Sequence, residues 1–215
     1  MTSAAAPVPH RPSRRAQIVE AAMRLHARQD GRPVTVAEIA REAYMSTPAI
    51  YYHYPSKDAV LLDGLSRFSA DLISVIRAAG EEAVRTGSVS DLVASVVRWL
   101  DGRRHEAVVW YLTAPQVINA DALRDELAAR TLEAWRDPVR VARAAGALSS
   151  ETGKSGGEMT DDEVDVVVVA CKSLLEISAQ SWLAEDQVRR VLGPKNFLAE
   201  VSRITVRLVM DTRGP

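Results

Sequence analysis

The chain has 215 residues, of which 47% are hydrophobic and 26% are charged, and its formal net charge is −1. No apolar run approaches the roughly 18 residues that a membrane-spanning helix needs, and the first residues lack the apolar stretch of about 7–15 residues of a secretory signal. The single cysteine, Cys171, excludes an intrachain disulfide and fits a reducing compartment, so we expect a cytoplasmic protein with no membrane partner.

Helical periodicity runs through most of the chain, and no hairpin signal such as Asn-Gly between alternating runs interrupts it. The first helix is predicted to begin after Ser13 and to end near Asp30-Gly31. The second begins at a capping box, residues 35–38, in which threonine and glutamate satisfy each other's backbone N–H groups. Ser46 is predicted to cap a third helix and Ser56 a fourth.

The same pattern continues beyond residue 80. It predicts helices that begin near Ser88, span about 105–114 and about 120–145, open at a second capping box at 160–163, and run from Pro194 to about Asp211. The Gly/Ser-rich segment 148–159 has no apolar period and is predicted to be a loop. Valines 166–169 could form a strand, but their neighbours continue at helical spacing. The predicted fold class is all-α, with about nine helices and no sheet.

Residues 35–53 have the pattern of a helix-turn-helix, in which a first helix braces a second one that enters the major groove of DNA. Small or rigid side chains at 47–49 allow a close approach to bases, whereas the rings at 51–53 can meet thymine methyl groups or phosphate. A lysine at the start of the next helix adds positive charge for a phosphate. The alternative is an ordinary helical hairpin with exposed or packed tyrosines. The candidate DNA-binding residues are Thr35, Ser46, Thr47, Pro48, Ala49, Tyr51, Tyr52, His53 and Lys57.

The charge distribution supports this hypothesis. Residues 1–60 hold eight basic and five acidic residues, a net charge of +3, whereas the remainder carries −4. A basic N-terminal segment on an otherwise acidic chain suits a segment that contacts phosphates. Ordinary variation of surface charge is the alternative. Arg11, Arg14 and Arg15 could reach a phosphate or the minor groove; for Arg11 and the tail before it, solvated disorder is the alternative.

Three stretches within residues 14–62, RRAQIVEAAMRLHA, TVAEIAREA and STPAIYYHYPSKDAVL, resemble the DNA-binding domain of the TetR family of bacterial transcriptional regulators. The resemblance implies DNA contacts at Thr35, Thr47, Pro48, Ala49, Tyr51, Tyr52, His53 and Lys57. It also implies an all-helical ligand-binding and dimerisation domain in the rest of the chain. We therefore expect a disordered tail at 1–12, a three-helix helix-turn-helix domain at 13–58, and a ligand-binding and dimerisation domain at 59–215.

Two residues depart from the family pattern. Tyr44 stands where the family usually has a glycine in the turn. A tyrosine at positive φ costs about 1 kcal/mol or more, so one expectation is a rearranged turn. Tyr54 replaces the usual phenylalanine and places a hydroxyl near the core, where it needs a hydrogen-bond partner.

The last two helices are apolar around more of their circumference than one core face requires. Two such helices from each chain would form a four-helix bundle, so we expect a homodimer; burial within the single chain is the alternative. The candidate dimer-interface residues are Leu174, Ile177, Trp182, Phe197, Val201, Ile204 and Leu208.

Aromatic residues gather in the middle helices, where the family builds its effector pocket. They could line a site for a small apolar effector, or they could simply form core. The candidate ligand-binding residues are Trp99, His105, Trp110, Tyr111 and Trp135.

Enzyme motifs give no support for catalysis. Gly153-Lys154-Ser155 resembles the end of a phosphate-binding loop, but the glycine that this motif needs at 148 is Leu148. Cys171 lies on an apolar stripe and is expected to be an inert core thiol. We expect no metal, no cofactor and no enzymatic activity; an all-α enzyme with a chance helix-turn-helix pattern is the remaining rival from that class.

The sequence thus predicts a homodimeric repressor that binds a palindromic operator in double-stranded DNA and is released by a small apolar effector, which would favour a conformation of lower DNA affinity. The alternative is a DNA-binding dimer that has no effector and acts through protein recruitment.

Overall fold

The computed structural model describes residues 14–28, 32–149 and 159–210, and these residues form helices and turns with no β-strand. The predicted all-α fold is confirmed for this part of the chain. Its α-helices are α1 (Arg14–Arg28), α2 (Val36–Glu42), α3 (Thr47–His53), α4 (Lys57–Thr86), α5 (Leu92–Trp99), α6 (Arg104–Val108), α7 (Ala114–Val117), α8 (Asp121–Ser149), α9 (Asp161–Ala184) and α10 (Gln187–Met210). A 3-10 helix, η1 (Leu100–Arg103), and a π-helix, η2 (Val109–Thr113), connect some of them. The tail 1–12, most of the predicted loop at 148–159 and the predicted helix end near 211 lie outside the described residues.

Four helices, α2, α3, α4 and α9, begin at their predicted caps, whereas α5 begins at Leu92 rather than near Ser88 and has no side-chain cap. Thr35 N–H donates to Glu38 Oε2 at 2.9 Å, and Glu38 N–H donates to Thr35 Oγ1 at 3.2 Å, which completes the first capping box. The second capping box, Thr160 with Glu163, has the same two bonds at 2.8 and 3.3 Å. Such caps stabilise a helix because they occupy backbone N–H groups that have no partner within it.

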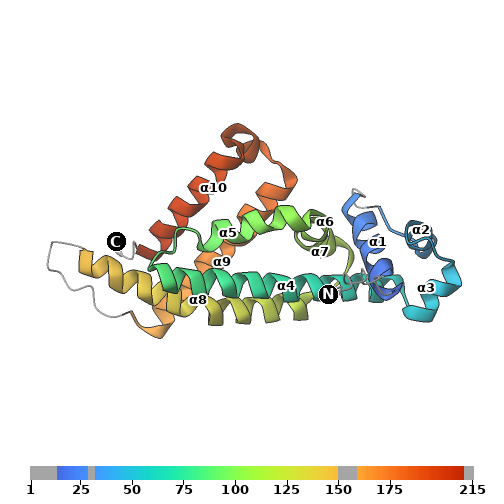
Figure 1. Ribbon diagram of the computed structural model, residues 1–215, viewed down its shortest axis with the longest axis horizontal. Coiled ribbons are helices and arrows are strands. Elements are labelled where there is room, and N and C mark those ends of the chain that lie inside the picture. The colour runs from blue at the N-terminus through green and yellow to red at the C-terminus, as the bar shows by residue number, and fades with distance from the viewer. Residues whose placement is uncertain (1–13, 29–31, 150–158, 211–215) are drawn as a thin grey trace, which may run out of the picture.

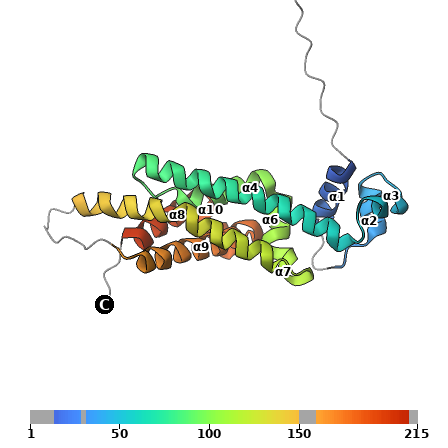
Figure 2. The same ribbon diagram turned by 90° about the horizontal axis from the view of Figure 1, so that it is seen from below.

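Figures 1 and 2 show α1, α2 and α3 together at one end of an elongated molecule, and α4 running from that end alongside α8. The helices α9 and α10 pack against α5 and α8. Glycines allow α4 to approach two neighbours closely. A Cβ at Gly64 would lie 2.7 Å from Met23 Sδ of α1, and one at Gly80 would lie 2.5 Å from the Ala134 carbonyl oxygen of α8.

The helix α4 joins the small end of the molecule to the larger part. It begins at Lys57 and continues to Thr86, so the predicted domain boundary between residues 58 and 59 falls in its first turn. Val60 and Leu61, just beyond that point, are fully buried in the core. The boundary itself stays a prediction.

Three helical features differ from the predictions or extend them. The last helix begins at Gln187 rather than Pro194, and Gly193, at φ 72° and ψ 161°, breaks it before the proline. The segment predicted as a helix at 105–114 includes the π-helix η2. Pro138 lies inside the continuous helix α8.

One helix has the composition of a membrane span. The helix α9 is long enough, and its most apolar 18-residue window has a mean hydropathy of 1.4, but 44% of that window is buried inside the structure. The prediction that no uninterrupted apolar run approaches this length is compatible with this finding, because charged residues interrupt α9. Core helices of helical bundles pass the same test, and α9 contacts α5, α8 and α10.

The turn between α2 and α3 keeps its left-handed residue although that residue is a tyrosine. Tyr44 has φ = 56°. Met45 N–H donates to the Ala40 carbonyl at 2.8 Å, and Tyr44 N–H donates to the Arg41 carbonyl at 3.2 Å. These two bonds form the Schellman motif, whose left-handed position usually holds glycine. The expected rearrangement of the turn is wrong, because the hydrogen bonds and the partly buried Met45 hold the ordinary geometry.

We expect Tyr44→Gly to raise the free energy of unfolding by up to about 1 kcal/mol, because glycine has no Cβ to clash at positive φ. Tyr44→Val should lower it, since a β-branched residue fits this region worst. Urea denaturation followed by circular dichroism measures both. A glycine variant less stable than the native protein would contradict the strain at this turn.

Candidate nucleic-acid interface

The helix α3 is anchored by one apolar residue and exposes an aromatic surface. Ile50 is buried, and the Ser46 hydroxyl caps the helix by accepting a hydrogen bond from Ala49 N–H at 3.4 Å. Tyr51 is 54% exposed and Tyr52 86% exposed. Large side chains exposed to this degree on a short helix indicate a surface that meets a partner.

The nine predicted DNA-binding residues lie on or next to α3, at the start of α2 and at the start of α4, and none is buried. Five are exposed: Thr35, Ser46, Pro48, Tyr51 and Tyr52. Four are half-buried: Thr47, Ala49, His53 and Lys57.

Some of these residues also make contacts within the chain. Thr35 and Ser46 serve as helix caps. The ring of His53 meets that of Tyr52 edge-on, with centroids 5.1 Å apart. Lys57 Nζ lies 3.3 Å from Asp58 Oδ1, at the start of α4. An ion pair this exposed is weak, so it leaves the lysine able to meet a phosphate.

The hydroxyl of Tyr54 has the partner that its position demands. This side chain is buried, and its hydroxyl donates to Asp63 Oδ2 at 2.5 Å. Arg67 donates to both oxygens of Asp63, at 2.8 and 2.9 Å. Burial alone would raise the pKa of Asp63, but the hydrogen bonds from Arg67 and Tyr54 outweigh it and lower that pKa. Burial raises the pKa of Tyr54, and its bond to Asp63 adds to the effect.

The arginines at the start of α1 have different surroundings. The Arg15 guanidinium lies over the ring of Tyr54, 4.4 Å from the ring centroid, and 3.7 Å from Asp63 Oδ2. Arg15 therefore supports the packing of α1 against Tyr54 and α4, a role that differs from the predicted contact with DNA. Arg14 is exposed, and Arg11 lies outside the described residues.

The predicted ligand-binding residues mostly fill the core. Trp135 is fully buried, and its indole N–H donates to the Ile76 carbonyl at 3.0 Å. Trp99 stacks on Phe68 with ring centroids 5.8 Å apart. His105 is exposed on α6. Contact of these three residues with a ligand stays a prediction.

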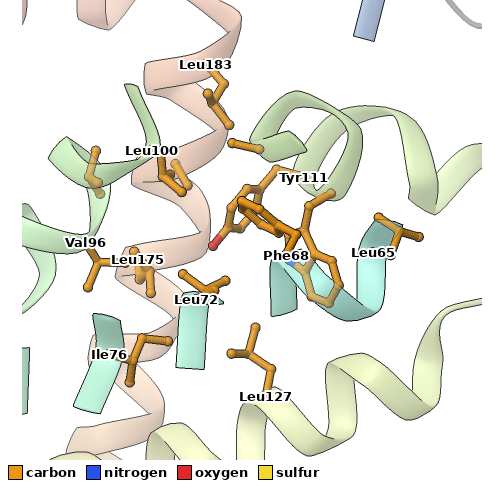
Figure 3. Close-up of a cluster of buried hydrophobic side chains, with 14 of the residues drawn as sticks. Leu65, Phe68, Leu72, Ile76, Val96, Leu100, Tyr111, Leu127, Leu175 and Leu183 are labelled. Carbon is orange, nitrogen blue, oxygen red and sulfur yellow. The ribbon is translucent and has the colours of Figure 1, made fainter. Parts of the chain in front are cut away.

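Trp110 and Tyr111 lie on the π-helix η2 and are buried. Figure 3 shows Tyr111 among Phe68, Leu72 and Leu175, with its hydroxyl oxygen directed towards the leucines. Burial raises the pKa of Tyr111 far above its ordinary value. The residue thus brings one polar atom into an apolar cluster formed by α4, α9 and η2.

Among the described residues, none of the five predicted ligand-binding residues lines either of the two best-defined hollows. The first, of about 540 Å³, is formed by residues of α7 and the start of α8, between Pro115 and Arg124. The second, of about 420 Å³, lies between α4 and α8, where Arg77, Gly80 and Pro138 are among its lining residues.

The predicted dimer-interface residues divide into two groups. Trp182, Phe197 and Val201 are buried inside the single chain, which corrects their expected place on the surface. Trp182 donates to Asp101 Oδ1 at 2.7 Å, and its ring packs against Phe197 with centroids 5.7 Å apart. Since these side chains already have partners in their own chain, they are not available to a second copy.

The other four predicted interface residues lie at the surface. Ile177, 66% exposed, and Ile204 are exposed, while Leu174 and Leu208 are half-buried. Val166, 70% exposed, and Val169 extend the apolar surface of α9. These two valines are not among the predicted interface residues, because the helical pattern of 166–169 alone does not show which side of the helix is exposed. Their spacing from Ser173 and Ile177 would have placed them on one face.

The comparisons with known proteins agree with this geometry. The sequence profile described as "Bacterial regulatory proteins, tetR family" matches residues 18–63. A comparison with curated protein sequences gives no match. Many solved structures share the fold. A TetR-family transcriptional regulator from Streptomyces coelicolor is 21% identical, with a TM-score of 0.63 over 91% of this chain and 79% of its own.

Two regulators named FadR have the same fold over nearly their whole length. The fatty acid degradation regulator from Bacillus halodurans is 18% identical, with a TM-score of 0.61 over 95% of this chain and 99% of its own. The regulator from Bacillus subtilis, solved in complex with stearoyl-CoA, is 20% identical, with a TM-score of 0.57 over 92% and 98%.

The profile match covers α2, α3 and the parts of α1 and α4 that pack around them, which are the elements that form the exposed aromatic surface. The solved structures share the all-helical fold of the remainder. Residues 18–63 therefore match the TetR family of bacterial regulatory proteins, and the described residues share their fold with these solved structures.

Proposed function

We propose that the protein is a repressor that binds a palindromic operator as a homodimer. The observation that supports this most is the exposed aromatic surface of α3 beside a buried Ile50, which holds the helix in place. A helix of seven residues contacts few base pairs. Two copies on half-sites about 34 Å apart, or a multiple of that distance, would supply the specificity that one lacks.

The proposed contacts follow from the position of each residue. Pro48 and Ala49, in the first turn of α3, present little bulk and allow the helix to enter the groove. Tyr51 and Tyr52 carry ring faces for thymine methyl groups and hydroxyl groups for phosphate. Lys57 lies at the start of α4, where backbone N–H groups and the helix dipole already favour an anion.

The proposed dimer interface is the apolar surface that α9 and α10 leave exposed. It consists of Val166, Val169, Leu174, Ile177, Ile204 and Leu208. Two helices from each chain would bring these faces together in a four-helix bundle and remove them from water, which stabilises the pair.

The proposed effector is a small molecule with a long apolar part, bound in the cluster around Tyr111. Phe68, Leu72 and Leu175 supply apolar contacts there, and the Tyr111 hydroxyl supplies one polar atom that could orient the ligand (Figure 3). The cluster is on a π-helical segment, a feature that is frequent at functional sites. Ligand binding would require the side chains of this cluster to move apart. Because Phe68 and Leu72 belong to α4, this movement would shift α4.

The alternative is a DNA-binding dimer that has no effector and recruits another protein. The burial of Trp110, Tyr111 and Trp135 in the core favours this alternative, because these aromatic side chains are already surrounded by protein atoms and leave no surface for a ligand. Direct ligand titration separates the two possibilities.

We expect Tyr51→Ala to weaken operator binding by roughly tenfold per half-site and Lys57→Ala to weaken binding to all sequences. The lysine variant should also reduce the slope of log K against log salt by about 1 for each bound chain. Fluorescence anisotropy with DNA fragments selected from genomic DNA measures both effects. Lys195→Ala, an exposed lysine on α10, is the matched control. Native affinity in both test variants would rule out the proposed docking.

Ile177→Arg should convert the dimer to monomers, because it places a charge in the centre of the proposed apolar interface. Size-exclusion chromatography with light scattering gives the mass, and circular dichroism confirms that the helices remain. Val84→Arg changes an exposed valine on α4 in the same way and should leave the dimer intact. A dimeric Ile177→Arg protein would place the interface elsewhere.

Stearoyl-CoA is the first effector to test, because a long acyl chain suits the cluster around Tyr111. We expect it to quench tryptophan fluorescence, since Trp99 and Trp110 border Phe68. Tyr111→Phe should weaken that binding by roughly fivefold, the value of one neutral hydrogen bond. If neither stearoyl-CoA nor shorter acyl chains alter the fluorescence or the DNA affinity, the alternative without an effector is favoured.

A further inference from the structure

Tyr44 combines an unfavourable backbone conformation with almost complete exposure. Its φ of 56° lies in the left-handed region, and its side chain is 97% exposed. A non-glycine residue in this conformation is strained, because its Cβ crowds the following carbonyl oxygen. A strained residue that persists at a surface is a reason to look for a role in binding.

Nothing described within the chain offsets this cost through the tyrosine side chain. The two hydrogen bonds of the turn involve only backbone atoms of residues 40, 41, 44 and 45, so a glycine would form them equally well. Among the described residues, the ring contacts, cation–π contacts and side-chain hydrogen bonds that involve tyrosines include Tyr52 and Tyr54 but not Tyr44. The phenol therefore contributes little to folding.

The location of Tyr44 places the phenol at the proposed DNA interface. It lies two residues before Ser46, which caps α3, in the turn between α2 and α3 at the end of the molecule that α1, α2 and α3 form (Figure 1). Arg41, three residues earlier, is also exposed. The first turn of α3 enters the groove in the proposed docking, so a side chain just ahead of it would stand at the groove's edge.

We propose that the Tyr44 hydroxyl donates a hydrogen bond to a phosphate oxygen of the operator, beside the groove that α3 enters. This inference rests on the proposed DNA-binding function. A phosphate is favoured over a base because Tyr44 precedes the reading helix, and residues around such a helix position it on the backbone. The phenol is a neutral donor and the phosphate a charged acceptor, a combination stronger than a bond between two neutral groups.

Tyr44→Phe tests the contact directly, because it keeps the ring and the backbone strain and removes only the hydroxyl. We expect it to lower affinity by roughly fivefold to tenfold per half-site. The loss should be equal for operator and unrelated duplexes, since a phosphate carries no sequence information. The salt slope should stay unchanged, since no charge is removed. Tyr44→Gly should lose affinity as well, although its fold should be more stable.

The native protein and Tyr51→Ala complete the experiment. If the native protein binds no duplex, the proposed function fails as a whole. If it binds, and Tyr51→Ala weakens binding while Tyr44→Phe has native affinity, the phosphate contact alone is overturned. A loss in Tyr44→Phe that is confined to the operator sequence would also overturn it, because it would indicate a contact with a base.

Discussion

The close packing of α4 against α1 and α8 fixes the position of α3 relative to the rest of the chain. At Gly64 and at Gly80, a single Cβ would meet the neighbouring helix, so the three helices hold one another in register. The salt bridge between Arg15 and Asp63 reinforces the α1–α4 contact, and the hydroxyl of Tyr54 ties the end of α3 to the same carboxylate. Because α4 is continuous, a shift of its far end would move the whole small end as a unit. This is the geometry that the proposed control by an effector requires.

Features set by local sequence were predictable, and those set by distant contacts were not. Both capping boxes, the caps at Ser46 and Ser56, and the inward position of Ile50 depend on neighbours within a few residues. The burial of Trp182 and Phe197 depends on Asp101 and on the break at Gly193, which no helical period reveals. An apolar stripe shows that a side chain needs cover, but it does not show whether its own chain or a second copy provides it.

The turn at Tyr44 shows how a strained residue separates folding from function. A glycine there would serve the helix-turn-helix at least as well, so the stability of the domain gives no reason for a phenol at this point. Tyr54 differs, because its hydroxyl donates a hydrogen bond to Asp63 and its ring makes a cation–π contact with Arg15, so both parts of the side chain stabilise the fold. Tyr54 thus serves the packing of its own chain, whereas Tyr44 is explained by the proposed contact with DNA.

The single thiol gives the molecule a built-in reporter. Cys171 is fully buried on α9, and burial raises its pKa to about 12, so alkylating reagents reach it only when the bundle opens. Its rate of modification therefore measures how often the interior is exposed to solvent. Because α9 also carries the proposed contact between chains, comparing that rate with and without DNA or acyl-CoA would follow internal motion in the native sequence, with no label introduced.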